Sequence, residues 1–276
     1  MKISIIVISK GRLHHLKQTV ESLVTQQLDG LADYEVLVVD YGCPDGTYAW
    51  CTQQNLPHLR SVRVDHDTMP LNKCRAKNFG ARCTNADWLM FLDVDLIIPA
   101  DLLRRSLSTC LENGSQWLRP AVRGNPVPLN PDNSRYWFPD AVEAGPPRGP
   151  DFVCVATFVA ADLFRSVDGN DECLPGWGYE DVDLGLRLFR KVGGQHYLIP
   201  ANFIFLNHSA DDSVRFFENK NKAETASKNL ERIQIHDRLI NPQGYGQSEL
   251  AAEWPESSPF RRDPERILRR TLVGNC

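Results

Sequence analysis

The chain has 276 residues, of which 42% are hydrophobic and 24% are charged, and its formal net charge is -4 at pH 7. This length and composition are typical of a globular protein with a sizeable core. The slightly acidic charge balance argues against a general nucleic-acid-binding protein, which would present a basic face.

Targeting and redox signals favour a cytoplasmic protein. No apolar run is long enough to span a bilayer, and a strand-like segment starts at Lys2, so we expect neither a transmembrane helix nor a signal peptide. The eight cysteines form no Cys-x-x-Cys pair, which favours free thiols in a reducing compartment. A basic stretch near the C-terminus is either a solvated helix face or a peripheral membrane contact. Its residues are Arg261, Arg262, Arg266, Arg269 and Arg270.

The first part of the chain alternates strand-like and helical segments. The expected strands are short apolar runs, at residues 2–8, 34–40, 61–64 and 88–92. The expected helices are residues 13–27, where apolar residues recur at helical spacing, and residues 72–81. This alternation predicts an α/β fold in which helices flank a mostly parallel central sheet. Ligands of such sheets bind beyond the carboxyl ends of the strands, where Asp40, Asp93 and Asp95 fall.

The second part is less regular. Residues 119–150 hold eight of the eighteen prolines and show no period, so we expect a mobile segment that contributes to an acceptor site. It offers Tyr136, Trp137 and Phe138 for stacking. Further strands are expected at residues 152–160 and 197–206, and further helices at 181–191 and 219–239. Residues 241–276 carry proline, glycine and charge, and are expected to form an arm or lid.

Asp93 and Asp95 form an Asp-x-Asp motif at the exit of a buried strand. Alternation along an extended segment places both carboxylates on one side. Such a pair can bind a divalent cation, which in turn binds a diphosphate. Because the motif also occurs by chance, two solvated turn aspartates are the alternative interpretation.

A second acidic group follows Trp177, whose flanking glycines predict a flexible loop. Glu180, Asp181 and Asp183 then stand at a predicted helix start, where the helix dipole favours carboxylates. Helix capping would explain one acidic residue at this position, but it is a less adequate explanation for three. His208 follows the next strand and is either structural or a nitrogen ligand that completes a metal site.

The order of these segments resembles that of GT-A-fold glycosyltransferases of the glycosyltransferase family 2 type. The similar segments are residues 5–12, 36–47, 72–80 and 88–95. The later Gly-Trp-Gly-Tyr-Glu-Asp segment and His208 are similar to the pattern of β-1,4-galactosyltransferases and polypeptide N-acetylgalactosaminyltransferases. The resemblance implies one GT-A domain over residues 1–240. Within it, residues 1–98 would be a Rossmann-like nucleotide-sugar-binding half and residues 99–240 an acceptor-binding half.

The resemblance also implies roles on the donor side. Asp40 would accept a hydrogen bond from the uracil ring of a uridine nucleotide. Arg75 would lie near the diphosphate, with Asn78 supporting the site. Asp93 would contact the ribose or sugar of the donor. Two departures affect this side of the site: Tyr41 stands where the family has a second acidic residue, and residues 9–11 replace its Pro-x-Tyr-Asn turn.

For catalysis, the resemblance implies that Asp95 and His208 bind the metal, with Asp93 as a further candidate ligand. Trp177 would stack near the sugars. Asp181 would be the general base, and Glu180 is its nearest competitor for that role.

The predicted function is transfer of a sugar from a nucleotide-diphosphate sugar, with UDP-sugar favoured, to a hydroxyl of a carbohydrate, peptide or small-molecule acceptor. Inversion at the anomeric carbon is expected, with Mn²⁺ or Mg²⁺ neutralising the leaving diphosphate. Two alternatives stay open. A sugar-phosphate nucleotidyltransferase would carry a Gly-rich basic loop after its first strand, which Ser9-Lys10-Gly11-Arg12 matches only faintly. A non-catalytic nucleotide-sugar- or carbohydrate-binding module would not need a base carboxylate beside a metal pair.

Overall fold

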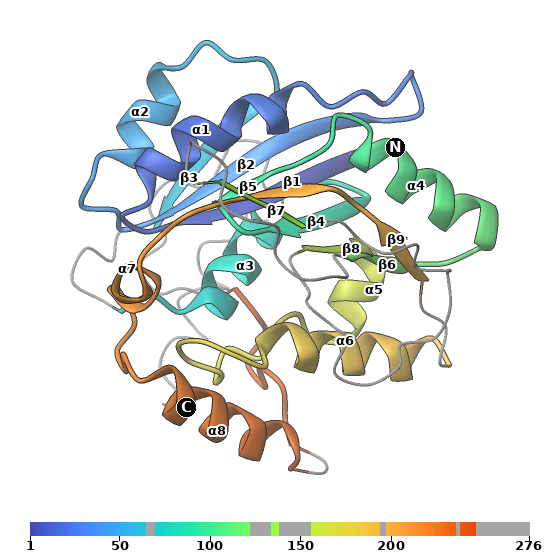
Figure 1. Ribbon diagram of the computed structural model, residues 1–276. Helices are drawn as coiled ribbons and strands as arrows, with labels where there is room; N and C mark the ends of the chain where they lie inside the picture. Colours follow the sequence, from blue (N-terminus) through green and yellow to red (C-terminus); the bar gives the residue numbers. More distant parts are fainter. Residues whose placement is uncertain (65–69, 122–133, 138–155, 194–196, 236–237, 247–276) are drawn as a thin grey trace.

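A seven-stranded sheet forms the centre of the protein, with strand order β3-β2-β1-β4-β8-β6-β9 (Figure 1). A second sheet has three strands in the order β5-β10-β7. The computed structural model describes residues 1–64, 70–121, 134–137, 156–193, 197–235 and 238–246.

The first half of the chain builds the parallel part of the large sheet. Its strands are β1 (Lys2–Ser9), β2 (Asp33–Tyr41), β3 (Leu59–Val64) and β4 (Trp88–Leu92). The helices between them are α1 (Leu13–Val24), α2 (Thr47–Gln53) and α3 (Lys73–Arg82). β1 pairs in parallel with both β2 and β4, and β2 pairs in parallel with β3. The carboxyl ends of all four strands therefore lie at one edge.

The second half extends this sheet with antiparallel and parallel pairs. The added strands are β6 (Trp117–Ala121), β8 (Ala156–Ala160) and β9 (Tyr197–Pro200). β8 runs antiparallel to β4 and β6, whereas β6 and β9 are parallel. The small sheet consists of β5 (Leu96–Ile97), β7 (Ser134–Trp137) and β10 (Phe203–Leu206). The helices of this half are α4 (Leu102–Asn113), α5 (Ala161–Ser166), α6 (Glu180–Lys191), α7 (Ala210–Val214) and α8 (Lys222–Ile233).

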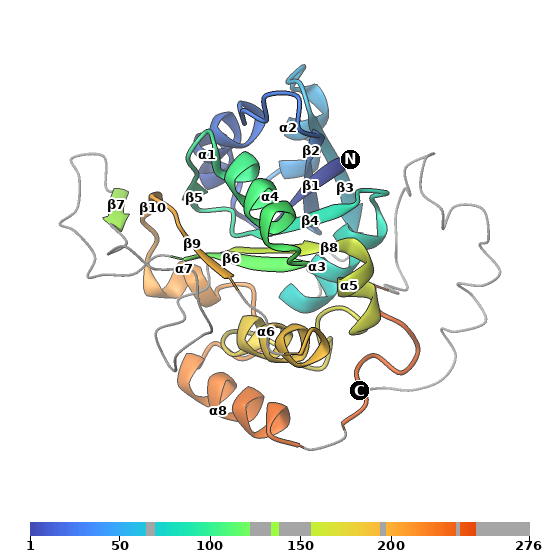
Figure 2. The same cartoon turned by 90° about the vertical axis from the view of Figure 1, so that its right-hand side faces the viewer.

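Helices cover both faces of the large sheet, and each face has its own apolar core. On one face, α1, α2 and α4 pack against side chains that include Ile3 and Ile5 of β1. On the other, α3, α5 and α6 pack against side chains that include Ile6 of β1. Alternate residues of β1 thus serve opposite cores, as the pleat requires. Figure 2 shows α8 outside α6, as a further layer.

Helix α3 approaches the sheet closely because Gly80 lies at the contact. A Cβ at this position would lie 2.6 Å from Cγ2 of Ile6 and 2.8 Å from Cγ2 of Val39. Any side chain here would push α3 away from the sheet. The close contact fixes the helix that carries several polar residues of the site described below.

The α/β architecture predicted from the sequence is confirmed, with a mainly parallel sheet between helices. Several boundaries differ. The first helix ends at Val24 rather than residue 27. Residues 197–206 are two strands in two sheets rather than one strand. The helix expected over residues 219–239 begins only after Asn221, whose side chain caps it by accepting from Glu224 N at 3.1 Å, and ends at Ile233.

The proline-rich segment at residues 119–150 contains regular secondary structure: residues 119–121 belong to β6 and residues 134–137 form β7. Other parts of that segment, at residues 122–133 and 138–150, lie outside the described residues, and so does the basic stretch at 261–270. Phe138 is therefore not described. Among the described cysteines five are free thiols, but Cys173 is disulfide-bonded, so the expectation of free thiols throughout is wrong. Within the described ranges, no helix is both long and apolar enough to cross a membrane.

Candidate active site

A cavity of about 150 Å³ lies beyond the carboxyl ends of β1 and β4. Asp93 and Asp95 follow β4 and line it, together with Trp177 and His208. This is the edge of the sheet where open α/β folds bind their ligands. The structure therefore brings together four of the residues that the sequence singled out, from three distant parts of the chain.

Asp95 and His208 contact each other: Nε2 of His208 lies 3.1 Å from Oδ2 of Asp95. The antiparallel pairing of β10 with β5 creates this meeting, and Leu206 N donates to Asp95 O at 2.9 Å. His15 of α1 contacts Asn207 O through Nε2 at 3.0 Å and so holds the residue before His208. Although burial alone would raise the pKa of Asp95, the hydrogen bond and charge of His208 lower it. The same hydrogen bond raises the pKa of His208.

Asp93 is a neighbour of this pair rather than part of a preformed cluster. Among the residues that the structure describes, no group of three or more His, Cys, Asp or Glu side chains is arranged to hold a metal ion. Burial raises the pKa of Asp93; the charge of Lys73 opposes that shift and the charge of Asp95 adds to it. Of the predicted set, Asp95 and His208 form a contacting pair, and Asp93 adds a second carboxylate to the same cavity.

Basic side chains converge on the same space, among them Arg12, Lys73 and Lys222. Lys73 Nζ lies 2.7 Å from Oε1 of Glu180, and Arg12 Nη2 donates to Asp212 O at 2.8 Å. Burial and the charges of Lys73 and Arg12 lower the pKa of Lys222, because like charges face one another. Cations that converge in this way favour an anionic ligand.

A second cavity, of about 410 Å³, adjoins the first and shares Arg12, Asp212 and Phe216 with it. Phe216 covers Gly11, which has a φ of +65°, and a Cβ there would lie 2.2 Å from Cε2 of Phe216. Leu71 N donates to Phe216 O at 2.6 Å and ties the same segment to the chain before α3. The segment after His208 therefore lies between the two cavities.

Asp40 is 1% exposed at the end of β2, and both of its carboxylate oxygens accept backbone hydrogen bonds. Oδ1 accepts from Cys43 N and Oδ2 from Tyr48 N, each at 2.7 Å. Burial raises the pKa of Asp40. Locally, this carboxylate holds the turn after β2 and the start of α2. To bind a nucleobase as well, one of these oxygens would have to accept a second hydrogen bond, from a ring NH, through its other lone pair.

Arg75 and Asn78 of α3 turn toward the chain segment that precedes α6. Arg75 Nε lies 3.8 Å from Glu172 Oε2, and Arg75 is not among the residues that line the 150 Å³ cavity. Asn78 is fully buried; its Nδ2 donates to Asn170 O and Glu172 Oε1, both at 2.8 Å, and its Oδ1 accepts from Asn170 N at 2.8 Å. In this position Asn78 supports the approach to the Gly-Trp-Gly loop.

Helix α8 packs against that loop and fixes Trp177 at the cavity. A Cβ at Gly176 or Gly178 would crowd side chains of α8, and Asn229 Nδ2 donates to Gly178 O at 2.8 Å. Trp177 remains 43% exposed, with Lys222 Nζ 5.2 Å from its ring centroid. An exposed indole in such a place offers a stacking surface to a ligand.

Glu180 and Asp181 begin α6 but have different surroundings. Glu180 is 5% exposed; Oε1 contacts Lys73 and Oε2 accepts from Gly178 N at 2.9 Å. Asp181 contacts Lys77 Nζ through Oδ1 at 2.7 Å, and its side chain is 26% exposed. Asp93, Lys77 and Asp181 also line one small cavity next to the larger one. Burial alone would raise the pKa of Asp181, but the charges of Lys77 and Lys73 lower it.

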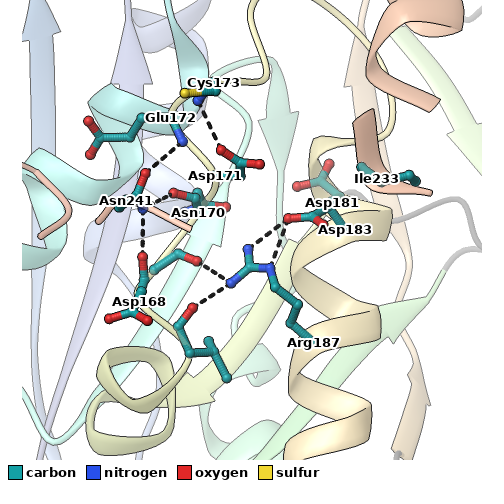
Figure 3. A network of polar contacts seen from close by, with 12 residues as sticks. Asp168, Asn170, Asp171, Glu172, Cys173, Asp181, Asp183, Arg187, Ile233 and Asn241 are labelled. Carbon is teal, nitrogen blue, oxygen red and sulfur yellow. Dashed lines mark hydrogen bonds and ion pairs between the residues drawn. The ribbon is translucent and has the colours of Figure 1, made fainter. Parts of the chain in front are cut away.

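A buried polar network holds this part of the chain to α6 and α8. Figure 3 shows its contacts with Arg187 of α6 and with Asn241. Asp171 is fully buried and accepts from Arg232 at 2.9 and 3.0 Å. Arg187 donates to Asp183 at 2.9 Å and to the backbone oxygens of residues 167 and 169. Asn241 Oδ1 accepts from Glu172 N at 3.0 Å. The first residues of the predicted C-terminal arm therefore pack against the domain.

Sequence reasoning missed Lys73, Lys77 and Lys222. The first two stand one helical turn apart within residues 72–80, so their position on one helix face could have been recognised from the sequence. Their partners on α6 were not readable, because more than a hundred residues separate them. No pattern in the sequence marked Lys222.

Residues 4–164 match the family described as Glycosyl transferase family 2. Because that match covers more than half of the chain, this protein belongs to glycosyltransferase family 2.

Two curated relatives are each named Validoxylamine A glucosyltransferase, from Streptomyces hygroscopicus subsp. jinggangensis (strain 5008) and from subsp. limoneus. Each is 26% identical to this chain in an alignment that covers 67% of it. The alignments cover 51% and 47% of the relatives, so this chain spans about half of their length.

Solved structures share the fold. S. aureus TarS 1-349 superposes with a TM-score of 0.57 at 17% identity, covering 77% of this chain and 62% of that one. Its complex with UDP-GlcNAc gives a TM-score of 0.55 at 16% identity, covering 73% and 58%. The mannosyltransferase PcManGT from Pyrobaculum calidifontis, in complex with GDP-Man and Mn²⁺, gives 0.51 at 16% identity, covering 72% and 54%. The fold of this chain is thus the GT-A fold.

Proposed function

We propose that this chain transfers a sugar from a nucleotide-diphosphate sugar, a UDP-sugar by preference, to a hydroxyl group of an acceptor. One observation carries the proposal: Asp93, Asp95, Trp177 and His208 line one cavity at the sheet edge, with Asp181 beside Asp93 in the adjoining one. Family membership supports it, as do relatives named as a glucosyltransferase and a fold neighbour in complex with UDP-GlcNAc.

The proposed metal is Mn²⁺ or Mg²⁺, held by Asp95 and His208. The fit rests on their contact at 3.1 Å, since one carboxylate and one imidazole suit Mn²⁺ and leave positions for diphosphate oxygens. When bound, the ion would neutralise charge on the leaving diphosphate. A fold neighbour in complex with GDP-Man and Mn²⁺ is consistent with this assignment.

On the donor side, we assign Asp93 to the ribose or sugar, Asp40 to the nucleobase and Arg75 to the diphosphate region, with Asn78 in support. Lys73 and Arg12 line the cavity and would add positive charge toward the diphosphate. Small-molecule sites have volumes of about 300–1,000 Å³, so the first cavity, of about 150 Å³, holds part of such a donor. The adjoining cavity would take more of the donor.

On the acceptor side, Asp181 is the proposed general base and the reaction inverts the anomeric carbon. A base must be deprotonated and exposed to the acceptor, and Asp181 combines a lowered pKa with a partly exposed carboxylate. Glu180 has both oxygens occupied by Lys73 and Gly178 N, which favours a supporting role for it. Trp177 would stack on a sugar, in keeping with the proposed similarity of this loop to the galactosyltransferase pattern.

The domain division stays part of the proposal. Residues 1–98 would bind the donor and residues 99–240 the acceptor, with residues 241–276 as an arm. The acceptor is a carbohydrate, peptide or small molecule, not a nucleic acid. We also propose a cytoplasmic location. For the basic stretch at residues 261–270, a solvated helix face stays the first interpretation and a peripheral membrane contact the alternative.

The test is release of UDP from UDP-glucose and UDP-GlcNAc, with GDP-Man for comparison, in the presence of Mn²⁺. Slow hydrolysis of a UDP-sugar that EDTA stops and Mn²⁺ restores is the expected result. Formation of UTP and a sugar 1-phosphate from the UDP-sugar and added pyrophosphate would indicate a nucleotidyltransferase instead. Tight donor binding without turnover under any of these conditions would indicate a binding module and contradict the proposal.

A further inference from the structure

Helix α3 presents two lysines, one turn apart, to the first two residues of α6. Lys73 Nζ lies 2.7 Å from Glu180 Oε1, and Lys77 Nζ lies 2.7 Å from Asp181 Oδ1. Residues four apart lie on the same face of a helix, so the two lysines form a matched pair. The close packing at Gly80 fixes the distance between α3 and the sheet.

Glu180 and Asp181 differ in how many of their carboxylate oxygens already have a hydrogen-bond partner. Glu180 uses its second oxygen, Oε2, to accept from Gly178 N at 2.9 Å. In the part of the chain that the structure describes, Oδ2 of Asp181 has no hydrogen bond. The Asp181 side chain is also 26% exposed, against 6% for that of Glu180. Asp181 is therefore held at one oxygen and open at the other.

Lys77 is suited to hold that oxygen in place. It is 5% exposed, and a buried ammonium group without a partner carries a large desolvation cost. Burial alone would lower the pKa of Lys77, but the charge of Asp181 raises it, so the lysine stays charged. The buried contact leaves the carboxylate little freedom to rotate, because turning Oδ1 away would leave the ammonium group buried without this partner.

We propose that Lys77 is a positioning residue for the general base: it binds Oδ1 of Asp181 so that Oδ2 faces the acceptor oxygen. This inference rests on the proposed function of Asp181. It differs from a purely structural tie between α3 and α6, because its effect on the reaction passes through the Asp181 carboxylate.

A double-mutant cycle tests it, with UDP-glucose and UDP-GlcNAc as donors, Mn²⁺ present and water as the acceptor. The variants are Lys77→Met, Asp181→Asn and the two combined. Misplacing a reacting group by about 1 Å costs about 10²-fold in rate. Lys77→Met should therefore lower kcat by about tenfold to a hundredfold, with the donor KM and the Kd of UDP unchanged. In the Asp181→Asn background the same change should cost nothing more.

Controls separate this role from weakened folding. Lys77→Arg keeps the charge and should retain most of the wild-type kcat. This variant can be compared directly with the wild type, so it tests the inference even if Lys77→Met does not fold. Arg187→Met breaks another buried ion pair on α6, at 2.8 Å to Asp183, and should change Tm more than kcat.

Several results would overturn the inference. These are an unchanged kcat in Lys77→Met, an equal loss in the Asp181→Asn background, or no recovery with Lys77→Arg. If the wild-type protein releases no UDP from either donor, the proposed function fails and the inference with it. If the wild type turns over but the cycle shows no coupling, only the inference fails.

Discussion

An ion pair between Arg232 and a fully buried carboxylate helps to hold helix α8, and breaking it should cost a sizeable part of the stability of the fold. Arg232 of α8 contacts Asp171, which is fully buried, at 2.9 and 3.0 Å. Arg232→Met leaves that carboxylate with Arg238 Nε at 3.3 Å and with Cys173 N at 3.0 Å. Removing one partner of a buried pair costs about 3–5 kcal/mol, and the remaining partners put this case near the lower end, at about 3 kcal/mol. For a chain of this size, that lowers Tm by roughly 6–12 °C.

The measurement is thermal unfolding of Arg232→Met by calorimetry or circular dichroism. The control is Lys228→Met on the same helix, which removes an exposed pair with Glu224 at 2.7 Å. Exposed pairs contribute little, so Tm should stay close to the wild-type value. If Arg232→Met unfolds within a degree or two of Lys228→Met, the network around Asp171 does not stabilise α8 as argued.

Four further outcomes are expected. Asp181→Asn should lower sugar transfer by about 10²–10⁴-fold while UDP binding with Mn²⁺, measured by calorimetry, stays near normal; a near wild-type rate would contradict its role as base. Asp95→Ala should lose Mn²⁺-dependent activity more fully than Asp93→Ala, and full wild-type activity in EDTA would contradict a metal requirement. Gly80→Ala should destabilise the fold by about 1–3 kcal/mol in urea unfolding, because its methyl group meets two sheet side chains below 3 Å; an unchanged midpoint would show that α3 shifts freely. Glu35 of β2 forms an ion pair with Arg60 at 3.2 Å. Burial alone would raise the pKa of Glu35, but the charge of Arg60 and the hydrogen bonds from Thr84 and Arg60 lower it. Its stabilising contribution is therefore present above the unfolded-state pKa of about 4.3 and is lost as pH falls through the lower folded value. Urea unfolding should show Glu35→Gln less stable than the wild type at neutral pH, with the difference shrinking in acid, and a pH-independent difference would rule out this linkage.

The strands of the large sheet could be predicted where burial is complete on both faces. β1, β2 and β4 are short apolar runs in sequence because helices cover both sides of them. β5 was not predicted because it is only two residues long, and β10 was merged with β9 into one expected strand. The pairing of β5 with β10 joins residues more than a hundred positions apart, so the sequence did not reveal it. α4 was missed although Leu102, Leu103 and Leu107 mark its buried face at helical spacing.

Some residues of the candidate site could likewise be predicted from the sequence, whereas their contacts could not. Asp93, Asp95 and Asp181 were singled out because local sequence places them at a strand end or a helix start. The pairing of Asp181 with Lys77 was not predicted, because it arises only when α3 and α6 pack on the same face of the sheet. Asp40 shows the converse: backbone NH groups three and eight residues later in the chain donate to its two oxygens, which the pattern of a strand-end aspartate did not reveal.

The antiparallel pairing of β4 with β8 limits how the molecule can admit and release large substrates. Five residue pairs join these strands, one from each half of the chain, within a continuous sheet. A jaw-like opening about a hinge between the halves would break that ladder and expose both cores. For the proposed reaction, access would instead depend on local rearrangement at the periphery, in the segment that carries Phe216 and in the loop that carries Trp177, with the continuous sheet left in place.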